Sequence, residues 1–331
     1  MPGWLKALAY RHVRGYRVGR GVKFGLGSAV VGRDVEIGDG AEIGMLAVVI
    51  GRRIRMAAHS SVGMMSYVAC NDIELGEDAR IREQVYVGGP QLPESRFVLG
   101  ARTIVLQMAY INPTKPVIIG DDSGIGGHCL IFTHGAWLSA FDGYPVTYAP
   151  VTIGASVWLP WRVFVMPGAS IGDGSVIGAN SLVSGDIPAG SLAVGSPAKV
   201  VRSAPDFPRR LDANGQRELL ATVVAEFDRW VEDEGVVVQR VALDERIYQR
   251  EGELHRLLVL GDSTGDALAR AGAGDTVLAL GPLDDSARDR LRRASVDYLD
   301  VTGKRRPRAG SALTEELAGF FGRYGVRFAR D

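Results

Sequence analysis

The chain has 331 residues, a length that suits two domains better than one. Lys plus Arg and Asp plus Glu are equal at 38 each, so there is no overall basic field, and the balance argues against a nucleic-acid partner. Two cysteines make no disulfide framework, and we find neither a secretory signal nor an apolar run of the roughly 20 residues that span a bilayer, so we expect a cytoplasmic protein without a transmembrane segment.

Residues 1–20 are expected to form a helical cap at the start of the chain. Leu5, Leu8 and Val13 fall on one face of the predicted helix, and the charged Lys6 and Arg14 lie elsewhere. The cap would cover the open end of the repeat that follows it. A basic helix lying on a membrane surface is the alternative.

A six-residue repeat occupies residues 21–204. A period of six is neither helical nor a simple strand alternation, and it is the signature of a β-helix in which each hexad makes one short strand and one turn. Insertions near 88–98 and at 137–150 interrupt about seven predicted coils, and Cys129 falls at an inward position. The aliphatic positions are Val31, Ile37, Ile43, Ile50, Met56, Val62, Val68, Leu75, Ile81, Val87, Leu99, Val105, Ile111, Ile119, Ile125, Ile131, Ile153, Leu159, Val165, Ile171, Ile177 and Val183.

The stretch 153–202 carries a more specific pattern. It contains IGASVWLP, VMPGASIGDGSVIGANSLVSGDIP and VGSPAKVVR. This pattern resembles the tail of the hexapeptide-repeat acyltransferases, in particular the galactoside, maltose and polysaccharide O-acetyltransferases. The resemblance implies a left-handed parallel β-helix and transfer of an acyl group from acyl-CoA to a hydroxyl of a sugar, oligosaccharide or polysaccharide. It also implies a homotrimer with each active site between two subunits.

His134 is the candidate general base. It follows Thr133 directly before the long insertion, where the resembled family has its catalytic histidine. Imidazole, with an ordinary pKa of about 6.5, suits proton removal from a hydroxyl near neutral pH. Asp142 or a backbone carbonyl would orient the ring. Trp137, Asp142 and Tyr144 in the insertion are candidate contacts for the carbohydrate acceptor, although these aromatic rings would equally pin the insertion to the solenoid or to a neighbouring subunit.

The resemblance places the donor along the last coils. Trp161, Ala179, Ser184, Lys199 and Arg202 are the expected CoA contacts, with the two cations near its phosphates. Trp161 stands where the family has a small residue, and Ser184–Gly185–Asp186 lacks the family's lysine. Arg162 could then pair with a carboxylate on the acyl group, so succinyl-CoA is considered beside acetyl-CoA. No metal is expected.

Other functions remain open. N-acyl transfer to an amino sugar is the nearest alternative, and a non-catalytic scaffold is another. A zinc carbonic-anhydrase-like enzyme is the least favoured, because His128 and His134 lie six residues apart rather than five and no third histidine is well placed.

Residues 205–331 are predicted to form a helix followed by a small α/β domain of unknown role. Pro205 and Pro208 mark the boundary, and an apolar stripe predicts the helix. Beyond this helix, apolar strand candidates alternate with polar helical stretches. The predicted strands are 236–242, 256–260, 276–280, 297–301 and 326–329, and the predicted helices are 284–293 and 312–323. Gly261–Asp262–Ser263 is interpreted as a turn at the end of a strand.

Overall fold

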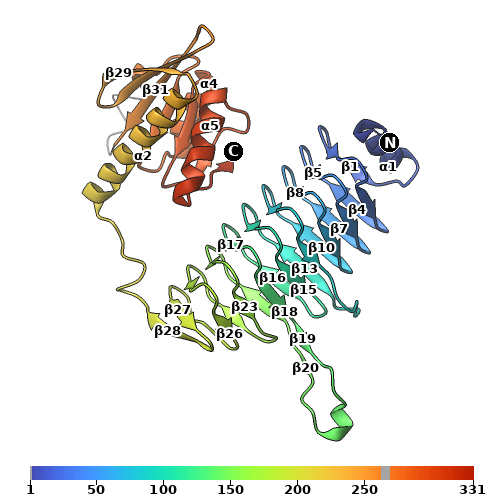
Figure 1. Ribbon diagram of the computed structural model, residues 1–331. Coiled ribbons are helices and arrows are strands. Elements are labelled where there is room, and N and C mark those ends of the chain that lie inside the picture. Colours follow the sequence, from blue (N-terminus) through green and yellow to red (C-terminus); the bar gives the residue numbers. More distant parts are fainter. Residues whose placement is uncertain (1, 262–268) are drawn as a thin grey trace. The chain divides into compact units, whose positions relative to one another are not determined.

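The computed structural model describes residues 2–261 and 269–331 of the chain (Figure 1). Two compact units divide the chain between Arg209 and Arg210, five residues beyond the boundary expected from the sequence. The first unit is a parallel β-helix preceded by one helix, and the second is a mixed sheet with helices. None of the helices in the described part of the chain combines the length and hydropathy that crossing a bilayer requires.

The β-helix is a prism with three parallel sheets as its sides, here called sheets A, B and C. Sheet A contains β1(Arg17–Val18), β4(Asp34–Ile37), β7(Arg53–Met56), β10(Asp72–Leu75), β13(Arg96–Leu99), β16(Val117–Ile119), β21(Val151–Ile153) and β24(Ser170–Ile171). Sheet B contains β2(Lys23–Phe24), β5(Glu42–Ile43), β8(Ser61–Val62), β11(Arg80–Ile81), β14(Ile104–Val105), β17(Gly124–Ile125), β22(Trp158–Leu159), β25(Val176–Ile177), β27(Leu192–Gly195) and the antiparallel β28(Ala198–Arg202). Sheet C contains β3(Ala29–Val31), β6(Val48–Ile50), β9(Tyr67–Ala69), β12(Tyr86–Val87), β15(Tyr110–Asn112), β18(Leu130–Phe132), β23(Phe164–Val165) and β26(Leu182–Val183).

The hexad aliphatics fill the interior of the prism, as the period predicts. Ile43, Ile111 and Val165 are fully buried. The small residue four places after each aliphatic also points inward, and several of its hydroxyl groups donate to turn carbonyls. Ser123 Oγ, for example, donates to Gly154 O at 2.9 Å. Gly172 marks a turn where the next coil passes closely, because a Cβ there would lie 2.4 Å from the amide nitrogen of Ala189.

The structure corrects the repeat at its beginning. Eight three-strand coils are present rather than about seven, because the first coil starts at Arg17 inside the segment expected to be a cap. The inward residues of two early strands are Val30 and Val49, and not Val31 and Ile50. Both strands are three residues long, so the chain turns one residue later than a strict six-residue count assumes.

The helix α1(Gly3–His12) packs on the first coil. Its buried residues are Lys6 and Ala7, and Lys6 Nζ donates to the carbonyl oxygens of Gly25 and Ser28 at 2.7 and 3.0 Å. Tyr10 and Tyr16 stack on each other at 5.5 Å between ring centroids. The end of the prism core is therefore covered by this helix and by the loop after it.

The second unit is an α/β fold around a seven-stranded mixed sheet. Its order is β29-β30-β31-β32-β33-β34-β35, with parallel pairing from β31 to β33. The predicted elements are present, together with two strands that the sequence did not reveal, β30 and β34. Gly261 is described, but Asp262 and Ser263 lie outside the described residues. The bounds are α2(Ala213–Asp233), β29(Val237–Ala242), β30(Glu245–Arg250), β31(Glu253–Leu260), β32(Thr276–Ala279), α4(Asp285–Arg293), β33(Asp297–Asp300), β34(Arg305–Arg306), α5(Ala312–Phe321), η2(Gly322–Tyr324) and β35(Ala329–Arg330).

Candidate active site

His134 lies where the chain leaves the prism between sheets C and A. The strand β18 ends at Phe132, and β19(His134–Gly135) then pairs antiparallel with β20(Thr147–Tyr148). These strands form the base of a hairpin arm that extends away from the coils, with η1(Ala140–Asp142) in its far part (Figure 1). The imidazole therefore sits at the root of the arm, on an edge of the prism, and is half-buried.

The orienting partner of His134 is Asn112, which the sequence analysis did not single out. Nδ1 of His134 lies 3.2 Å from Asn112 Oδ1, and Asn112 is buried. The same oxygen accepts from the Thr114 hydroxyl at 2.7 Å and from the Thr114 backbone N–H at 3.2 Å. A backbone N–H only donates, so the carboxamide atom that faces it must be the oxygen.

This arrangement determines which ring nitrogen is available for chemistry. Because Asn112 Oδ1 can only accept, Nδ1 of His134 must carry the proton and donate it. Nε2 of the neutral ring is then unprotonated and can accept a proton. Tyr148 stacks on the ring with centroids 5.8 Å apart and planes 19° apart, which restricts its rotation. The site therefore holds an oriented imidazole whose Nε2 can accept a proton.

Of the insertion, Tyr148 stacks on His134, whereas the predicted acceptor contacts Trp137, Asp142 and Tyr144 lie farther out along the arm. Trp137 is 96% exposed, Phe141 is fully exposed and Tyr144 is also exposed. Asp142 is part of η1 in the far part of the arm, and the oriented nitrogen of His134 is held by Asn112. The aromatic side chains at the end of the arm thus lack packing against their own prism.

The expected donor residues are distributed over three places. Trp161, Arg162 and Ala179 lie in turns between sheets B and C, the edge opposite His134 across sheet C. Ser184 lies in a turn between sheets C and A, two strands beyond the strand that precedes His134. Lys199 and Arg202 are exposed on β28, the last strand of sheet B. Within one chain, His134 and Trp161 are therefore roughly 10–15 Å apart, which is the width of sheet C.

The other histidines of the prism do not join this site. His128 is exposed in the turns between sheets B and C, with its ring 5.6 Å from that of Trp161. His59 lies in a turn between sheets A and B. Among residues 2–261 and 269–331, His, Cys, Asp and Glu form no group of three that could hold a metal ion. Burial raises the pKa of the Cys129 thiol to about 11, as expected of a core residue.

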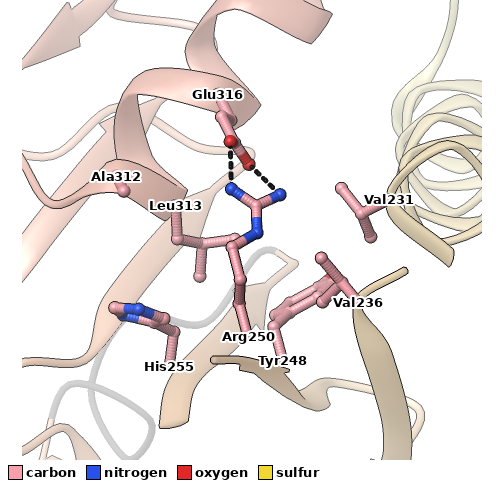
Figure 2. Close-up of a pocket in the computed structure, with 8 residues that line it drawn as sticks. All are labelled: Val231, Val236, Tyr248, Arg250, His255, Ala312, Leu313 and Glu316. Carbon is pink, nitrogen blue, oxygen red and sulfur yellow. Dashed lines mark hydrogen bonds and ion pairs between the residues drawn. The ribbon is translucent and has the colours of Figure 1, made fainter. Parts of the chain in front are cut away.

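The second unit contains a small cavity, drawn in Figure 2, and an apolar groove. Arg250 and Glu316 form a two-bonded ion pair beside His255 in the cavity, which encloses about 30 Å³, room for about one water molecule. The groove, of about 330 Å³, is lined mainly by aliphatic and aromatic residues of α2 and of the segment after α5, with Leu280 and Val301. The cavity is too small for a sugar, and the groove is too apolar to bind one.

Comparisons with known proteins agree with the repeat and the fold. No family model matches the chain. Galactoside O-acetyltransferase of Escherichia coli (strain K12) is 49% identical over 142 residues, which are 40% of this chain and 64% of the relative. The chain is thus similar to members of the hexapeptide-repeat acetyltransferase family, and it spans less than two thirds of this relative.

Further similarities to this family are shorter or structurally more distant. A Staphylococcus aureus (strain MRSA252) protein assigned as an acetyltransferase is 58% identical over 53 residues, 16% of this chain and 27% of the relative. The chain thus spans about a quarter of that protein. A hexapeptide-repeat acetyltransferase from Vibrio cholerae, crystallised with acetyl-CoA, is 26% identical with a TM-score of 0.31, covering 44% of this chain and 67% of that structure. The prediction of a mainly β fold with a left-handed β-helix is confirmed.

Proposed function

We propose that this protein is an acyl-CoA-dependent O-acyltransferase that acylates a carbohydrate hydroxyl. The observation that carries the proposal is the Asn112–His134 pair, which leaves His134 Nε2 free at the root of the arm. Similarity to the hexapeptide-repeat acetyltransferases supplies the acyl donor and the class of acceptor as expectations. The acceptor is a sugar, oligosaccharide or polysaccharide, and the protein acts in the cytoplasm.

The proposed reaction needs one base and no acyl-enzyme. His134 Nε2 removes the proton of the acceptor hydroxyl as its oxygen attacks the thioester carbonyl carbon. The tetrahedral intermediate collapses with breakage of the carbon–sulfur bond, and the imidazolium gives its proton to the leaving thiolate. The products are the ester and free CoA thiol. The Nδ1 proton stays on His134 throughout and is donated to Asn112 Oδ1, so the ring keeps its orientation.

The cations on β28 fit the donor's phosphates. Lys199 and Arg202 are exposed, and within the described residues neither forms an ion pair. Trp161 would contact the pantetheine region, with Ala179 and Ser184 contributing turn amides. Arg162 is exposed beside Trp161, with its backbone at φ 61°. It would meet a carboxylate if the transferred group is succinyl.

A homotrimer would complete the site. His134 and Trp161 lie on opposite edges of sheet C, so a second subunit has to supply the donor side to His134. Sheet C presents a stack of half-exposed rings, Tyr67, Tyr86, Tyr110, Phe132 and Phe164, with centroids 4.9–5.5 Å apart. The exposed Trp137 and Phe141 of the arm would be covered by a neighbour. Such apolar surface is typical of contacts between subunits.

Release of CoA thiol from acetyl-CoA and from succinyl-CoA, measured with a panel of saccharides, tests the function. Mass spectrometry then identifies the product ester. His134→Ala is expected to lower kcat by about 10²–10⁴-fold, because it removes the base. The matched control is His59→Asn, which removes a histidine from another edge of the prism and keeps a residue that tolerates left-handed backbone.

The result for the two variants decides the proposal. A fully active His134→Ala variant that melts like the wild type would refute His134 as the base. Thiol release with acetyl-CoA alone would dismiss the succinyl donor. An amide product from an amino sugar would replace O-acyl transfer with N-acyl transfer.

A further inference from the structure

The N-terminal end of the prism exposes apolar side chains on α1. Trp4 is 71% exposed, Leu8 is 47% exposed and Val13, directly after the helix, is 81% exposed. The opposite side of the helix is attached to the first coil, where Lys6 bonds to the carbonyls of Gly25 and Ser28. These two residues flank Leu26, so the helix adjoins the turn that carries this leucine.

The exposed apolar surface continues along the turns between sheets B and C in the first three coils. Leu26 is 68% exposed, Leu46 is 52% and Met65 is 51%. Leu46 N donates to Leu26 O at 2.8 Å and Met65 N to Met45 O at 2.9 Å, so the three turns stack directly. The fourth coil has Glu83 and Gln84 there, which ends the strip. We call this surface the cap patch: Trp4, Leu5, Leu8, Leu26, Met45, Leu46, Met64 and Met65.

Two members of the cap patch have an unfavourable backbone conformation. Leu46 and Met65 both have φ 58°, a left-handed conformation that branched and bulky residues rarely adopt. Corresponding turns of later coils have a similar φ at Gln84, Met108, His128, Arg162 and Asn180, so the left-handed turn belongs to the fold. What distinguishes the first three coils is that exposed apolar side chains fill these turns in succession, which solubility does not require.

All charged side chains before Asp34 are positive, and carboxylates of the second coil lie beside two of them: Asp39 Oδ1 accepts from the Arg20 backbone N–H, and Glu42 pairs in register with Lys23. The seven charged residues before Asp34 are Lys6, Arg11, Arg14, Arg17, Arg20, Lys23 and Arg33. Arg17 is neutralised by Asp34 and Glu36, whereas Arg11 donates only to the carbonyls of Val18 and Gly19. Arg14 and Arg20 are exposed. This concentration contrasts with the overall charge balance of the chain.

We propose that the cap patch and its basic residues dock the protein on an anionic lipid bilayer. Tryptophan and leucine beside Arg and Lys are the side chains that insert at a bilayer interface and attract acidic headgroups. A second copy meeting this surface face to face would bring the same positive charges together, which opposes symmetric self-association. The docking surface is on coils 1–3, apart from His134 in the sixth coil.

Co-sedimentation of the full chain with vesicles tests this proposal. The protein is expected to pellet with vesicles of phosphatidylcholine and phosphatidylglycerol, and not with phosphatidylcholine alone. The double variant Arg14→Glu/Arg20→Glu should lower the partition coefficient by at least about tenfold, since each basic residue near an anionic surface favours binding. Trp4→Ser/Leu8→Ser should lower it comparably. Arg209→Glu/Arg210→Glu, also exposed, is the charge-matched control and should bind like the wild type.

Three results would overturn the proposal. Absence of pelleting with anionic vesicles is the first. Binding that responds to the charge variant but not to Trp4→Ser/Leu8→Ser, and that heparin abolishes, would indicate a site for a soluble polyanion. A change of oligomeric state in Trp4→Ser/Leu8→Ser, measured by sedimentation, would indicate contact with a second copy. Unchanged melting of each variant excludes unfolding as the cause.

Discussion

Sheets A and C have the same inward pattern but opposite outer faces. On sheet A, charged residues of alternating sign pair between coils, as in Arg53–Asp72 at 2.6 Å and Arg96–Glu74 at 3.0 Å. On sheet C the equivalent outward column contains Tyr67, Tyr86 and Tyr110, stacked along the axis. The inward residues therefore specify the coil, whereas the outward residues determine what each face of the prism contacts. Sheet A is suited to water and sheet C to another protein surface.

The largest effect is expected from placing charge on sheet C. Tyr86→Glu/Tyr110→Glu should dissociate the proposed trimer and abolish acyl transfer, because buried carboxylates without partners are costly at an interface. Ile118→Glu on sheet A, where the native residue is 38% exposed, is the matched control and should retain both. Sedimentation velocity and thiol release measure the outcome. An equal loss of assembly and of acyl transfer in both variants would show that sheets A and C do not differ in their role at the subunit contact.

A substitution inside the prism should lower the stability of the fold and leave the contacts between subunits unchanged. Ile111 is fully buried in β15, and Ile111→Ala is expected to lower the free energy of unfolding by about 2–5 kcal/mol, because it deletes apolar contacts and leaves a cavity. Chemical denaturation measures this loss. A value below about 1 kcal/mol would mean that the coil interior relaxes around the smaller side chain.

Substitution of Asn112 should affect catalysis more than stability. Asn112→Ala is expected to lower kcat by about tenfold or more, because the His134 ring loses its orienting acceptor. Asn112→Asp should retain most activity, since a carboxylate accepts the same bonds. An Asn112→Asp variant as inactive as Asn112→Ala would argue against contact between residue 112 and the His134 ring.

The smallest effect is expected on sheet A. The hydrogen bond from Arg55 holds the pKa of the Asp34 carboxyl below its ordinary value. A depressed carboxyl pKa stabilises the folded state above about pH 4, and the contribution disappears as the pH falls through the lowered value. Arg55→Met should lower Tm by less than about 2 °C at pH 7, because the pair is exposed, and by nothing measurable at pH 2–3. A large loss at both pH values would show a packing role for Arg55.

The sequence predicted the repeat well and the site only in part. The hexad period located the buried Ile43, Val62 and Ile81, because a prism needs an inward aliphatic on every strand. It failed at Val31 and Ile50, where one-residue changes in strand length shift the inward position. Asn112 escaped detection because its contact with His134 crosses between neighbouring coils. Aligning the coils, which pairs Asn112 with Phe132, would have revealed it.

The donor residues show a different limit of sequence reasoning. Trp161 and Ser184 are close in the sequence pattern but lie on different edges of the prism, because every hexad turns the chain onto a new side. Linear spacing thus indicates membership of a motif and does not indicate which edge a side chain occupies. The second unit adds an example, because the sequence predicted no strand at Arg305 and Arg306, which form β34, and Arg306 pairs there with Glu315.

Because the coils stack uniformly, each coil adds one fixed step to the length of the prism. Five strand-to-strand steps on sheet C separate the first coil from the strand that precedes His134, on the order of 24 Å at about 4.8 Å per step. Deleting one coil between residues 53 and 71 would shorten this distance by one step while preserving the pairing on both sides. The number of coils thus sets the distance between the imidazole of His134 and the N-terminal end of the prism. If that end docks on a membrane, a change in this number would change which part of a membrane-anchored polysaccharide could reach His134.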